Sequence, residues 1–534
     1  MRRHVISKQL LVLTILSSLV LFSSIIGQRS EKGAPLDNKL PYVPGELLVK
    51  FKDGAESNFA RSVNSIIGTT AVETLGDSNW QRVKLPEGMS VESAISGYSL
   101  RSGVEYSQPN FYYHLLATPN DPEYLSNITT SMYGLGKISA PAAWDLHTGS
   151  STVVVADIDT GLRYTHEDLA ANAWVNLGEV PNNGIDDDND QIIDDVFGAD
   201  FRDNDGDPMD DNGHGTHTAG TIGGVGNNLL GVTGINWNVK IMAVKIYSGA
   251  GTDTTSAMLI NAYNYVGMMK NRGVNIRVTN NSYGGCDEAC GYDQATKDAI
   301  DKLGDAGILN VFAAGNSGTN NDVTPHYPSN YTSPSIVAVG ASDIDDTRFY
   351  NYGPISVDLG APGVGILSTT SSSDNAYGLM SGTSMATPHV TGAVALLASY
   401  RPDLSVASLK ASILNNVDLI PAWSTLVKTG GRLNVFKAMQ NPTVCTFNNG
   451  ATRIQSRAAG GTYTINIPAA TNCDYFVKSN NAWVTRNTAE VMSGANTVSI
   501  TVGSNTGLPR TGTVTIGGQI YTIVQSGSRQ KGSK

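Results

Sequence analysis

The sequence has little charge and almost no cysteine. Of its 534 residues, 16% are charged, 4 are cysteine, and the net charge is −11 at pH 7. Nucleic-acid binding rewards clustered lysine and arginine, so this charge balance argues against a nucleic-acid partner. Hydrophobic residues make up 40% of the chain and glycine occupies 57 positions, a composition typical of a compact globular protein rich in tight turns.

The few cysteines form two pairs by their proximity in the sequence. Cys286 stands close to Cys290, and Cys445 to Cys473. Neither pair offers the CxxC-type sets with matching ligands that zinc requires. Two disulfides would suit an oxidising compartment. They stay predictions at this stage, because sequence spacing does not show that the Cβ atoms meet.

Beyond the N-terminus, the sequence lacks any segment apolar enough to span a membrane. At the start, Arg2 and Arg3 precede an apolar stretch over residues 10–26 that is broken by small hydroxyl residues. This pattern predicts a secretory signal peptide over 1–27, cleaved near Gly27. The alternative is an uncleaved anchor, for which the stretch is near the lower length limit. We therefore predict an exported protein. It would be secreted to the extracellular space, with the cell surface and a periplasm as the other possible locations.

Three zones of different pattern follow. Residues 28–117 contain alternating apolar positions, as in VPGELLVKF, and predict a small α+β unit. In 118–440, short apolar runs ending in glycine-rich turns alternate with helical patterns, which predicts an α/β domain with a parallel sheet and helices on both faces. Residues 443–527 alternate with period two and predict a β-sandwich. The tail over 528–534 is predicted to be disordered.

Polar residues stand where apolar runs give way to turns. Asp159 ends the run VVVADID, and Asn316 follows another run in AAGNSG. In parallel sheets the ligand crevice lies beyond the carboxyl ends of the strands, so both residues are expected at that edge. His214 opens a predicted helix of small residues. Ser384 precedes an amphipathic run, in which we expect Pro388 in the first helical turn.

These residue types together indicate nucleophilic catalysis. A serine hydroxyl is a weak nucleophile until a base takes its proton, and the base needs a third group to fix its tautomer. Aspartate, histidine and serine follow one another here in one of the chain orders that support this geometry. A helix N-terminus at Ser384 favours developing negative charge, and Asn316 could donate to an oxyanion.

Four segments resemble the signature blocks of subtilisin-like serine proteases, in the thermitase-like branch of that family. They are DTG at 159–161, HGTHTAG at 214–220, AAGNSG at 313–318 and GTSMATPHV at 382–390. The resemblance covers 118–440 and implies that Asp159 orients His214, the general base. Ser384 is then the nucleophile, and Asn316 completes the oxyanion hole. The segment NNSYGG resembles the family's strand that pairs with substrate backbone, through Ser282, Tyr283 and Gly284.

The two histidines of HGTH are expected to differ in role. His214 matches the catalytic histidine of the family, whereas His217 matches a structural one. A zinc site is the alternative, and it is disfavoured because the helical metalloprotease motif H-E-x-x-H has a glutamate that this segment lacks.

Calcium is the cofactor that the resemblance implies. The ion takes about six to eight oxygen ligands, which closely spaced carboxylates supply. DFRDNDGDPM resembles a calcium loop of the thermitase-like branch, with Asp200, Asp203 and Asp205 as side-chain ligands. Asp207 stands where that branch has threonine, and Met209 could offer only its carbonyl. A second site is implied at Asp121, Asp168 and Asn228, with the carbonyls of Val225, Leu230 and Val232. The alternative for either loop is an acidic segment that is merely solvated.

A third acidic segment, IDDDNDQIIDD, also has alternating carboxylates at Asp186, Asp188 and Asp190. It lacks the glycine and the glutamate of an EF-hand loop, because Gln191 and Phe197 stand at those positions. A third calcium ion is therefore one hypothesis for this segment, and solvation is the other.

The flanking zones have resemblances of their own. Residues 28–117 resemble the inhibitory pro-segment of the family, cut near Leu116 or Ala117. A slow-folding parallel sheet gives such a folding aid a physical purpose. Residues 443–527 resemble a BACON-type β-sandwich, for which a glycan partner and a plain spacer role are both open. Trp483 could be a stacking platform there, although a core position is favoured.

The sequence as a whole predicts an exported, calcium-stabilised, subtilisin-like serine endopeptidase. It would be made as a zymogen, inhibited by its own pro-segment, act as a monomer and hydrolyse proteins or peptides. The rival hypothesis is a non-catalytic adhesion or glycan-binding protein on a protease scaffold. An esterase is a further alternative, but the serine lies in GTSMA rather than in a GxSxG elbow.

Overall fold

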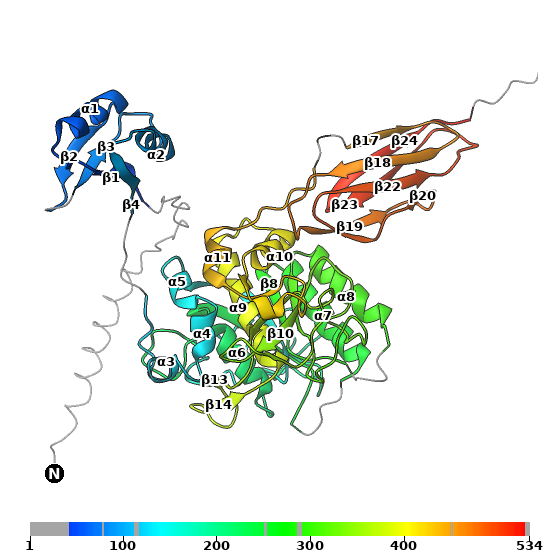
Figure 1. Ribbon diagram of the computed structural model, residues 1–534. Coiled ribbons are helices and arrows are strands. Elements are labelled where there is room, and N and C mark those ends of the chain that lie inside the picture. Colours follow the sequence, from blue (N-terminus) through cyan, green and yellow to red (C-terminus); the bar gives the residue numbers. More distant parts are fainter. Residues whose placement is uncertain are drawn as a thin grey trace, which may run out of the picture. The chain divides into compact units, whose positions relative to one another are not determined.

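The computed structural model describes residues 42–76, 79–111, 117–249, 254–285, 291–448, 450 and 452–528 (Figure 1). The chain divides into two compact units, residues 1–115 and 116–534. The predicted signal peptide, Cys286 and Cys290, Leu116 and the tail from residue 529 lie outside the described residues. Among the residues that are described, no helix has both the length and the apolar character needed to cross a membrane.

The first unit is a small α+β fold around one antiparallel sheet, in the order β2-β3-β1-β4. Its strands are β1 (Tyr42–Phe51), β2 (Thr70–Thr74), β3 (Trp80–Lys84) and β4 (Val104–Phe111). Its helices are α1 (Asn58–Ile67) and α2 (Val91–Ser99). Leu47, Val49 and Phe51 of β1 are fully buried against these helices, as the period-two pattern predicts.

The second unit is built on a ten-stranded sheet in the order β15-β16-β12-β10-β9-β8-β5-β7-β6, with β11 beside β10. All of its ladders are parallel except those of β11 and β15. The strands are β5 (Gly149–Asp159), β6 (Gly198–Asp200), β7 (Asn238–Lys245), β8 (Ile276–Asn281), β9 (Leu309–Ala313), β10 (Ile336–Ser342), β11 (Arg348–Phe349), β12 (Leu359–Pro362), β15 (Asp418–Leu419) and β16 (Gly431–Arg432).

Helices cover both faces of this sheet. They are α3 (Pro122–Asn127), α4 (Tyr133–Lys137), α5 (Ala140–Trp144), α6 (His214–Gly223), α7 (Ser256–Asn271), α8 (Gln294–Asp305), α9 (Thr383–Tyr400), α10 (Val406–Asn415) and α11 (Val435–Gln440). A 3-10 turn, η1 (Pro421–Trp423), and a hairpin of β13 (Ile366–Thr369) and β14 (Tyr377–Met380) complete the fold.

The central strand β5 shows how one apolar run serves two cores. Val153 and Val155 pack into the core that holds α6 and α9, whereas Val154, Ala156 and Ile158 pack into the core that holds α7 and α8. A strand buried on both faces reads as a continuous apolar run for this reason. The predicted α/β sheet with helices on both faces is confirmed.

The C-terminal part of the second unit is a strand-rich sandwich. Its two sheets run β17-β24-β23-β19-β21 and β18-β22-β20, and their inner residues form one shared core. The strands are β17 (Arg453–Ser456), β18 (Gly461–Ile467), β19 (Asp474–Ser479), β20 (Val484–Arg486), β21 (Val491–Ser493), β22 (Asn496–Val502), β23 (Arg510–Ile516) and β24 (Gln519–Gln525). A disulfide joins Cys445 to Cys473, as their proximity predicts.

Trp483 of this sandwich is half-buried against the shared core. The guanidinium of Arg510 lies over its ring, 4.2 Å from the ring centre. The ring face that Arg510 covers is therefore not open to a sugar.

Candidate active site

Strand β5 delivers Asp159 to the carboxyl edge of the sheet. Asp159 is the last residue of β5 and is 2% exposed. Its Oδ1 accepts a hydrogen bond from the backbone N–H of Thr160 at 2.8 Å and lies 2.7 Å from Nδ1 of His214. Because Nδ1 faces a carboxylate, it holds the proton, and Nε2 of His214 is left as the nitrogen that can accept one.

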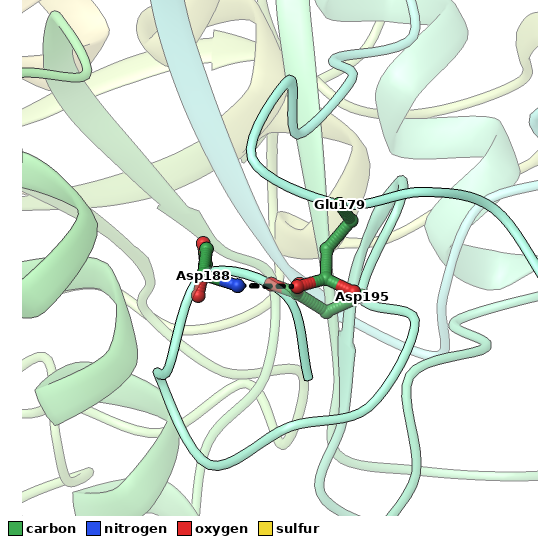
Figure 2. Close-up of side chains that lie close together, drawn as sticks. All are labelled: Glu179, Asp188 and Asp195. Carbon is green, nitrogen blue, oxygen red and sulfur yellow. Dashed lines mark hydrogen bonds between the residues drawn. The ribbon is translucent and has the colours of Figure 1, made fainter. Parts of the chain in front are cut away.

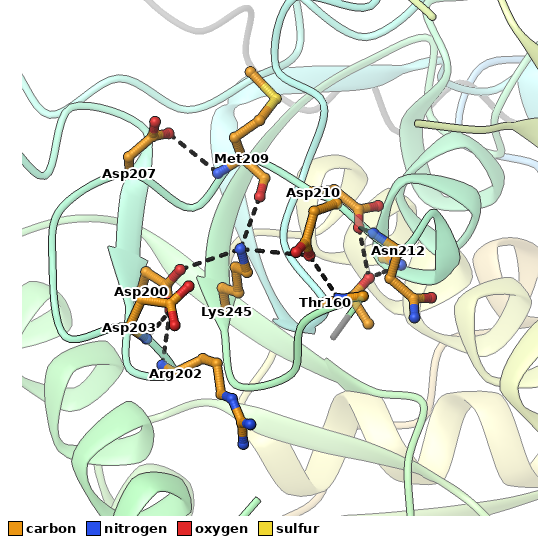
Figure 3. A network of polar contacts seen from close by, with 12 residues as sticks. Thr160, Asp200, Arg202, Asp203, Asp207, Met209, Asp210, Asn212 and Lys245 are labelled. Atoms are coloured by element: carbon orange, nitrogen blue, oxygen red, sulfur yellow. Dashed lines mark hydrogen bonds and ion pairs between the residues drawn. The ribbon is translucent and has the colours of Figure 1, made fainter. Parts of the chain in front are cut away.

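His214 is placed by the start of helix α6. Gly213 precedes it with φ 105°, a left-handed conformation that favours glycine. Asp210 accepts bonds from the N–H groups of Asn212, Gly213 and Thr216 and from the hydroxyls of Thr160 and Thr216 (Figure 3). This buried carboxylate ties the end of β5 to the first turn of α6. Sequence reasoning missed it, because Asp210 stands outside the N-cap position, which Gly213 occupies without a side-chain bond.

Ser384 is the second residue of helix α9. Its Oγ donates to the carbonyl of Ser282 at 2.9 Å, and the Ser282 hydroxyl donates to the Ser384 carbonyl at 2.9 Å. The prediction that Pro388 lies in the first helical turn is wrong, because it is the sixth residue of α9. Proline has no N–H to give to the carbonyl four residues earlier. That carbonyl belongs to Ser384, and the Ser282 hydroxyl donates to it instead.

Asn316 lies beyond β9, exposed, beside the start of α9. Its Oδ1 accepts from both the N–H and the hydroxyl of Thr383, each at 2.9 Å. The oxygen of the amide is thereby engaged with Thr383. Asn316 Nδ2 lies 3.3 Å and the Ser384 N 3.6 Å from the point where a Cβ on Gly382 would stand. An exposed amide N–H donor near the candidate nucleophile is the arrangement that an oxyanion hole requires.

The electrostatics of the site act on His214. Burial alone would lower the pKa of His214, but the charge and hydrogen bond of Asp159, with Asp157 and Asp210, outweigh it and raise that pKa. His217 behaves differently, because burial lowers its pKa to about 4. Its Nε2 donates to the carbonyls of Ile366 and Gly378, so the structure places it as a neutral bridge between α6 and the β13–β14 hairpin.

Asp157 is a second buried aspartate on the same face of β5, and sequence reasoning missed it. Its carboxylate accepts from Asn280 Nδ2 at 2.8 Å and Thr218 Oγ1 at 2.9 Å. Asn280 also reaches Ser282 Oγ at 3.0 Å and accepts from Thr391 of α9. Burial, followed by the charge of Asp159, raises the pKa of Asp157 well above its ordinary value. This hub joins the strand and the two helices that hold Asp159, His214 and Ser384.

The three residues predicted to bind substrate backbone follow β8. Ser282 is buried and contacts Ser384, and the Tyr283 hydroxyl points inward to Tyr263 at 2.6 Å. Gly284 is exposed, and a Cβ there would meet the ring of His326 at 1.7 Å. The structure therefore brings Ser282 next to the candidate nucleophile and leaves the backbone at Gly284 accessible.

Comparison with known proteins identifies this arrangement. Residues 150–460, more than half of the chain, match the Subtilase family (Peptidase_S8). The chain belongs to the subtilase family. Residues 29–110 match the Fervidolysin N-terminal prodomain. It is thus a thermitase-like subtilase with a pro-segment, and a serine endopeptidase.

Two individual relatives agree with this assignment. The thermophilic serine proteinase of Bacillus sp. (strain AK1) is 34% identical over 78% of this chain and 90% of its own length. Thermitase of Thermoactinomyces vulgaris is 38% identical over 60% of this chain and 99% of its own length. The crystal structure of a cold adapted subtilisin-like serine proteinase is 30% identical, with a TM-score of 0.42 over 54% of this chain and 90% of that chain.

One predicted metal site of this subtilase gathers two fully buried carboxylates, Asp121 and Asp168. Asp121 accepts from the N–H groups of Asn227 and Asn228, and Asp168 accepts from the Asn228 amide and the Val232 N–H, all within 2.7–2.9 Å. Burial raises the pKa of both carboxyls, that of Asp168 to about 7. No ion pair among the described residues involves either carboxylate, so this all-oxygen set fits a hard cation.

A lysine ammonium group already lies against the other predicted metal loop, residues 200–209 (Figure 3). Lys245, at the end of β7, has its Nζ 3.2 Å from Asp200 Oδ2 and donates to the Met209 carbonyl at 3.0 Å. Burial opposes the charge of Lys245, but Asp200 and its acidic neighbours raise the pKa of this lysine. Asp203, Asp205 and Asp207 are exposed, and Asp207 accepts from the Tyr164 hydroxyl at 3.0 Å. An ammonium group thus stands against two of the oxygen donors predicted to bind calcium.

Proposed function

We propose that this subtilase hydrolyses peptide bonds through Ser384, with His214 as the base and Asp159 as its orienting group. The 2.7 Å contact between His214 Nδ1 and Asp159 Oδ1 carries the proposal, because it leaves Nε2 free to take the serine proton. The Ser384 hydroxyl turns from the Ser282 carbonyl to His214 when a substrate is bound, since apo contacts tighten only in the complex. Asn316 and the Ser384 N–H hold the oxyanion, and Ser282, Tyr283 and Gly284 line the substrate.

Replacement of Asn316 tests the oxyanion role. Asn316→Ala is expected to lower kcat by about 10²–10³-fold, the magnitude known for an oxyanion-hole asparagine of a subtilisin, with KM little changed. Asn316→Asp is the matched variant, since it keeps the acceptor that bonds Thr383 but has no N–H for the substrate. It should lose at least as much activity in steady-state assays on a chromogenic peptide. Wild-type kcat in Asn316→Asp would exclude the role.

The proposal includes self-processing between Leu116 and Ala117. The Ala117 N–H donates to the Asp145 carboxylate at 2.6 Å. Cleavage at this bond would make that nitrogen an α-ammonium group, so an existing hydrogen bond would become an ion pair. The inhibitory segment predicted over 28–117 would then end at Leu116. The mature chain would begin at Ala117 and contain the catalytic domain predicted over 118–440 and the sandwich over 443–527.

Export is the second part of the proposal. It is supported by the signal-like sequence over 1–27 and by the Cys445–Cys473 disulfide, which suits an oxidising compartment. A BACON-type identity of the sandwich, a glycan partner and a monomeric state stay predictions. Arg510 on Trp483 weighs against that ring as the sugar platform.

Calcium stabilisation is the third part, with the ion held by Asp121, Asp168, Asn228 and the carbonyls of Val225, Leu230 and Val232. Calcium would neutralise the two buried carboxylates and join the segment before α3 to the 225–232 loop. For Asp200, Asp203, Asp205 and Asp207 calcium stays a prediction, because Lys245 already brings a positive charge to Asp200.

Chelation tests this stabilisation. At a free calcium concentration of 100 times Kd, bound calcium should raise the free energy of unfolding by about 2.7 kcal/mol, and its removal should lower it by the same amount. Calorimetry of the Ser384→Ala chain, which avoids autolysis, should show a lower Tm, and Asp168→Asn should shrink the difference. Asp345→Asn makes the same charge change at an exposed carboxylate, and this variant should keep the full Tm difference between calcium and chelator. A Tm that chelator does not move would contradict the calcium role.

A further inference from the structure

The loop between Asn176 and β6 gathers five carboxylates around one short stretch of backbone. Glu179, Asp188 and Asp195 bring oxygens within 4.8 Å of one another (Figure 2), and so do Asp186, Asp188 and Asp190. Asp188 belongs to both groups. Glu179 lies upstream of the acidic run and Asp195 at its far end. The fold therefore adds two carboxylates to Asp186, Asp188 and Asp190, the three that the sequence pattern indicated.

Most of this charge is withdrawn from water. Asp195 is 0%, Asp190 5% and Glu179 7% exposed. Within the described part of the chain, Arg272 is the cation that forms an ion pair here, with Nη1 2.7 Å from Asp188 Oδ1. Five carboxylates against one guanidinium leave a large uncompensated negative charge. Burying such charge is costly unless a cation is paired with it.

Asp190 provides a second and independent observation. Its Oδ1 accepts from the Ile192 N–H at 2.8 Å, whereas its buried Oδ2 has no hydrogen-bond partner. A buried carboxylate oxygen without a partner is rare and needs an explanation such as a bound ion. Asp190 belongs to the group that includes Asp186 and Asp188, so its carboxylate lies among other carboxylates.

Backbone N–H groups of the loop hold Asp186 and Glu179 in place by bonding both oxygens of each carboxylate. Asp186 accepts from the N–H groups of Asp190 and Gln191, and Glu179 accepts from those of Asp187, Asp188 and Asp194. Asn189, Gln191 and Asp194 have positive φ values near 58–79°, a conformation that costs energy for residues other than glycine. The loop is thus shaped to keep like charges together.

We propose that the 179–195 loop is a cation site of its own, for a hard divalent cation with the preferences of calcium. Asp186, Asp188 and Asp190 contribute ligand oxygens, and Asp190 Oδ2 is the ligand that no other group satisfies. Glu179 and Asp195 close the site from either end of the loop. Calcium fits better than magnesium, because an irregular all-carboxylate loop suits a large ion with flexible geometry. The inference does not depend on the catalytic proposal.

Tyr265 supplies a direct reporter for this site. Its hydroxyl donates to Asp195 Oδ2 at 2.5 Å. Terbium(III) replaces calcium at oxygen sites and emits when a nearby tyrosine transfers energy to it. Excitation of the protein should therefore produce terbium emission from this loop, and calcium should compete it away.

The experiment uses the full chain carrying Ser384→Ala, so that proteolysis plays no part. Equilibrium dialysis with calcium counts bound ions, and terbium titration reports on the loop. Asp190→Asn is expected to bind one ion fewer, or to bind it at least ten-fold more weakly. Tyr265→Phe should keep the ion count and lose part of the sensitised emission. Asp187→Asn, an exposed carboxylate of the same loop outside both groups, should match the parent.

The outcomes separate the sites. Asp168→Asn should remove a different ion and leave the Tyr265-sensitised emission, so a failure of that calcium site would not imitate a failure of this one. Far-UV circular dichroism shows whether Asp190→Asn is folded, and Asp186→Asn serves in its place if it is not. An ion count and affinity unchanged by both substitutions would overturn the proposal.

Discussion

A Ser384→Ala variant is expected to lose peptide hydrolysis by about 10⁶-fold in kcat, the magnitude known for the catalytic serine of a subtilisin. Without the hydroxyl there is no nucleophile for His214 to activate, and no covalent intermediate can form. The variant should also keep its pro-segment, because self-processing uses the same chemistry. Intact mass after refolding with calcium checks both points: wild type should begin at Ala117, and the variant should remain unshortened.

The control for this prediction is Ser372→Ala, which removes an exposed serine of the same unit. It should process and hydrolyse substrate like the wild type. Shortening of Ser384→Ala at the same bond, with no other protease present, would show that the serine is not the nucleophile. If the wild type and Ser384→Ala both stayed full length, the results would favour the non-catalytic binding hypothesis.

The second large effect is expected for Asp159→Asn, with a loss of about 10⁴-fold in kcat, as in other serine-protease triads. Asparagine has nearly the same shape, but its amide does not stabilise a protonated Nδ1 as the carboxylate does. The imidazole then adopts the other tautomer, with the proton on Nε2, and cannot act as a base toward Ser384. Stopped-time assays at high enzyme concentration measure the residual rate.

The pH profile gives this variant a readout of its own. His214 must be neutral to accept a proton, so activity falls as the pH drops through its pKa. Asp159 raises that pKa, which places the acid limb of kcat/KM above the ordinary histidine value in the wild type. Asp159→Asn should move the limb to lower pH, whereas Asp345→Asn should leave it in place. An acid limb that does not move would contradict the coupling of Asp159 to His214.

Several features of the site follow from short stretches of sequence. Asp159 and His214 stand at element boundaries that local patterns mark: an apolar run that ends, and a helix that begins after glycine. Parallel strands put all their carboxyl ends at one edge, so the pattern of runs already predicted where the groups would meet. The period-two alternation of β1 likewise predicted which side chains are buried.

Other features have no local signal. Asp157 bonds Asn280 across 123 positions of sequence, and only the pairing of β5 with β8 brings the two together. In the sequence Lys245 is an ordinary lysine at the end of a strand. Only the pairing of β7 with β6 places its ammonium group beside Asp200. The sequence places Pro388 in a first helical turn. Its role emerges only because Ser282, just after β8, donates to the carbonyl that the proline leaves free.

By itself the sequence determined the order of the elements, the α/β sheet, the sandwich and the blocks that carry Asp159, His214, Asn316 and Ser384. The elements depend on periodicity and on residue type at element ends, which neighbours along the chain suffice to define, whereas the blocks were identified by their resemblance to a family. Tertiary structure alone decided which buried charges are compensated. Lys245 neutralises Asp200 from within, whereas Asp190 keeps an oxygen with no partner. Charge compensation depends on distance and burial in space, and spacing along the chain contains neither.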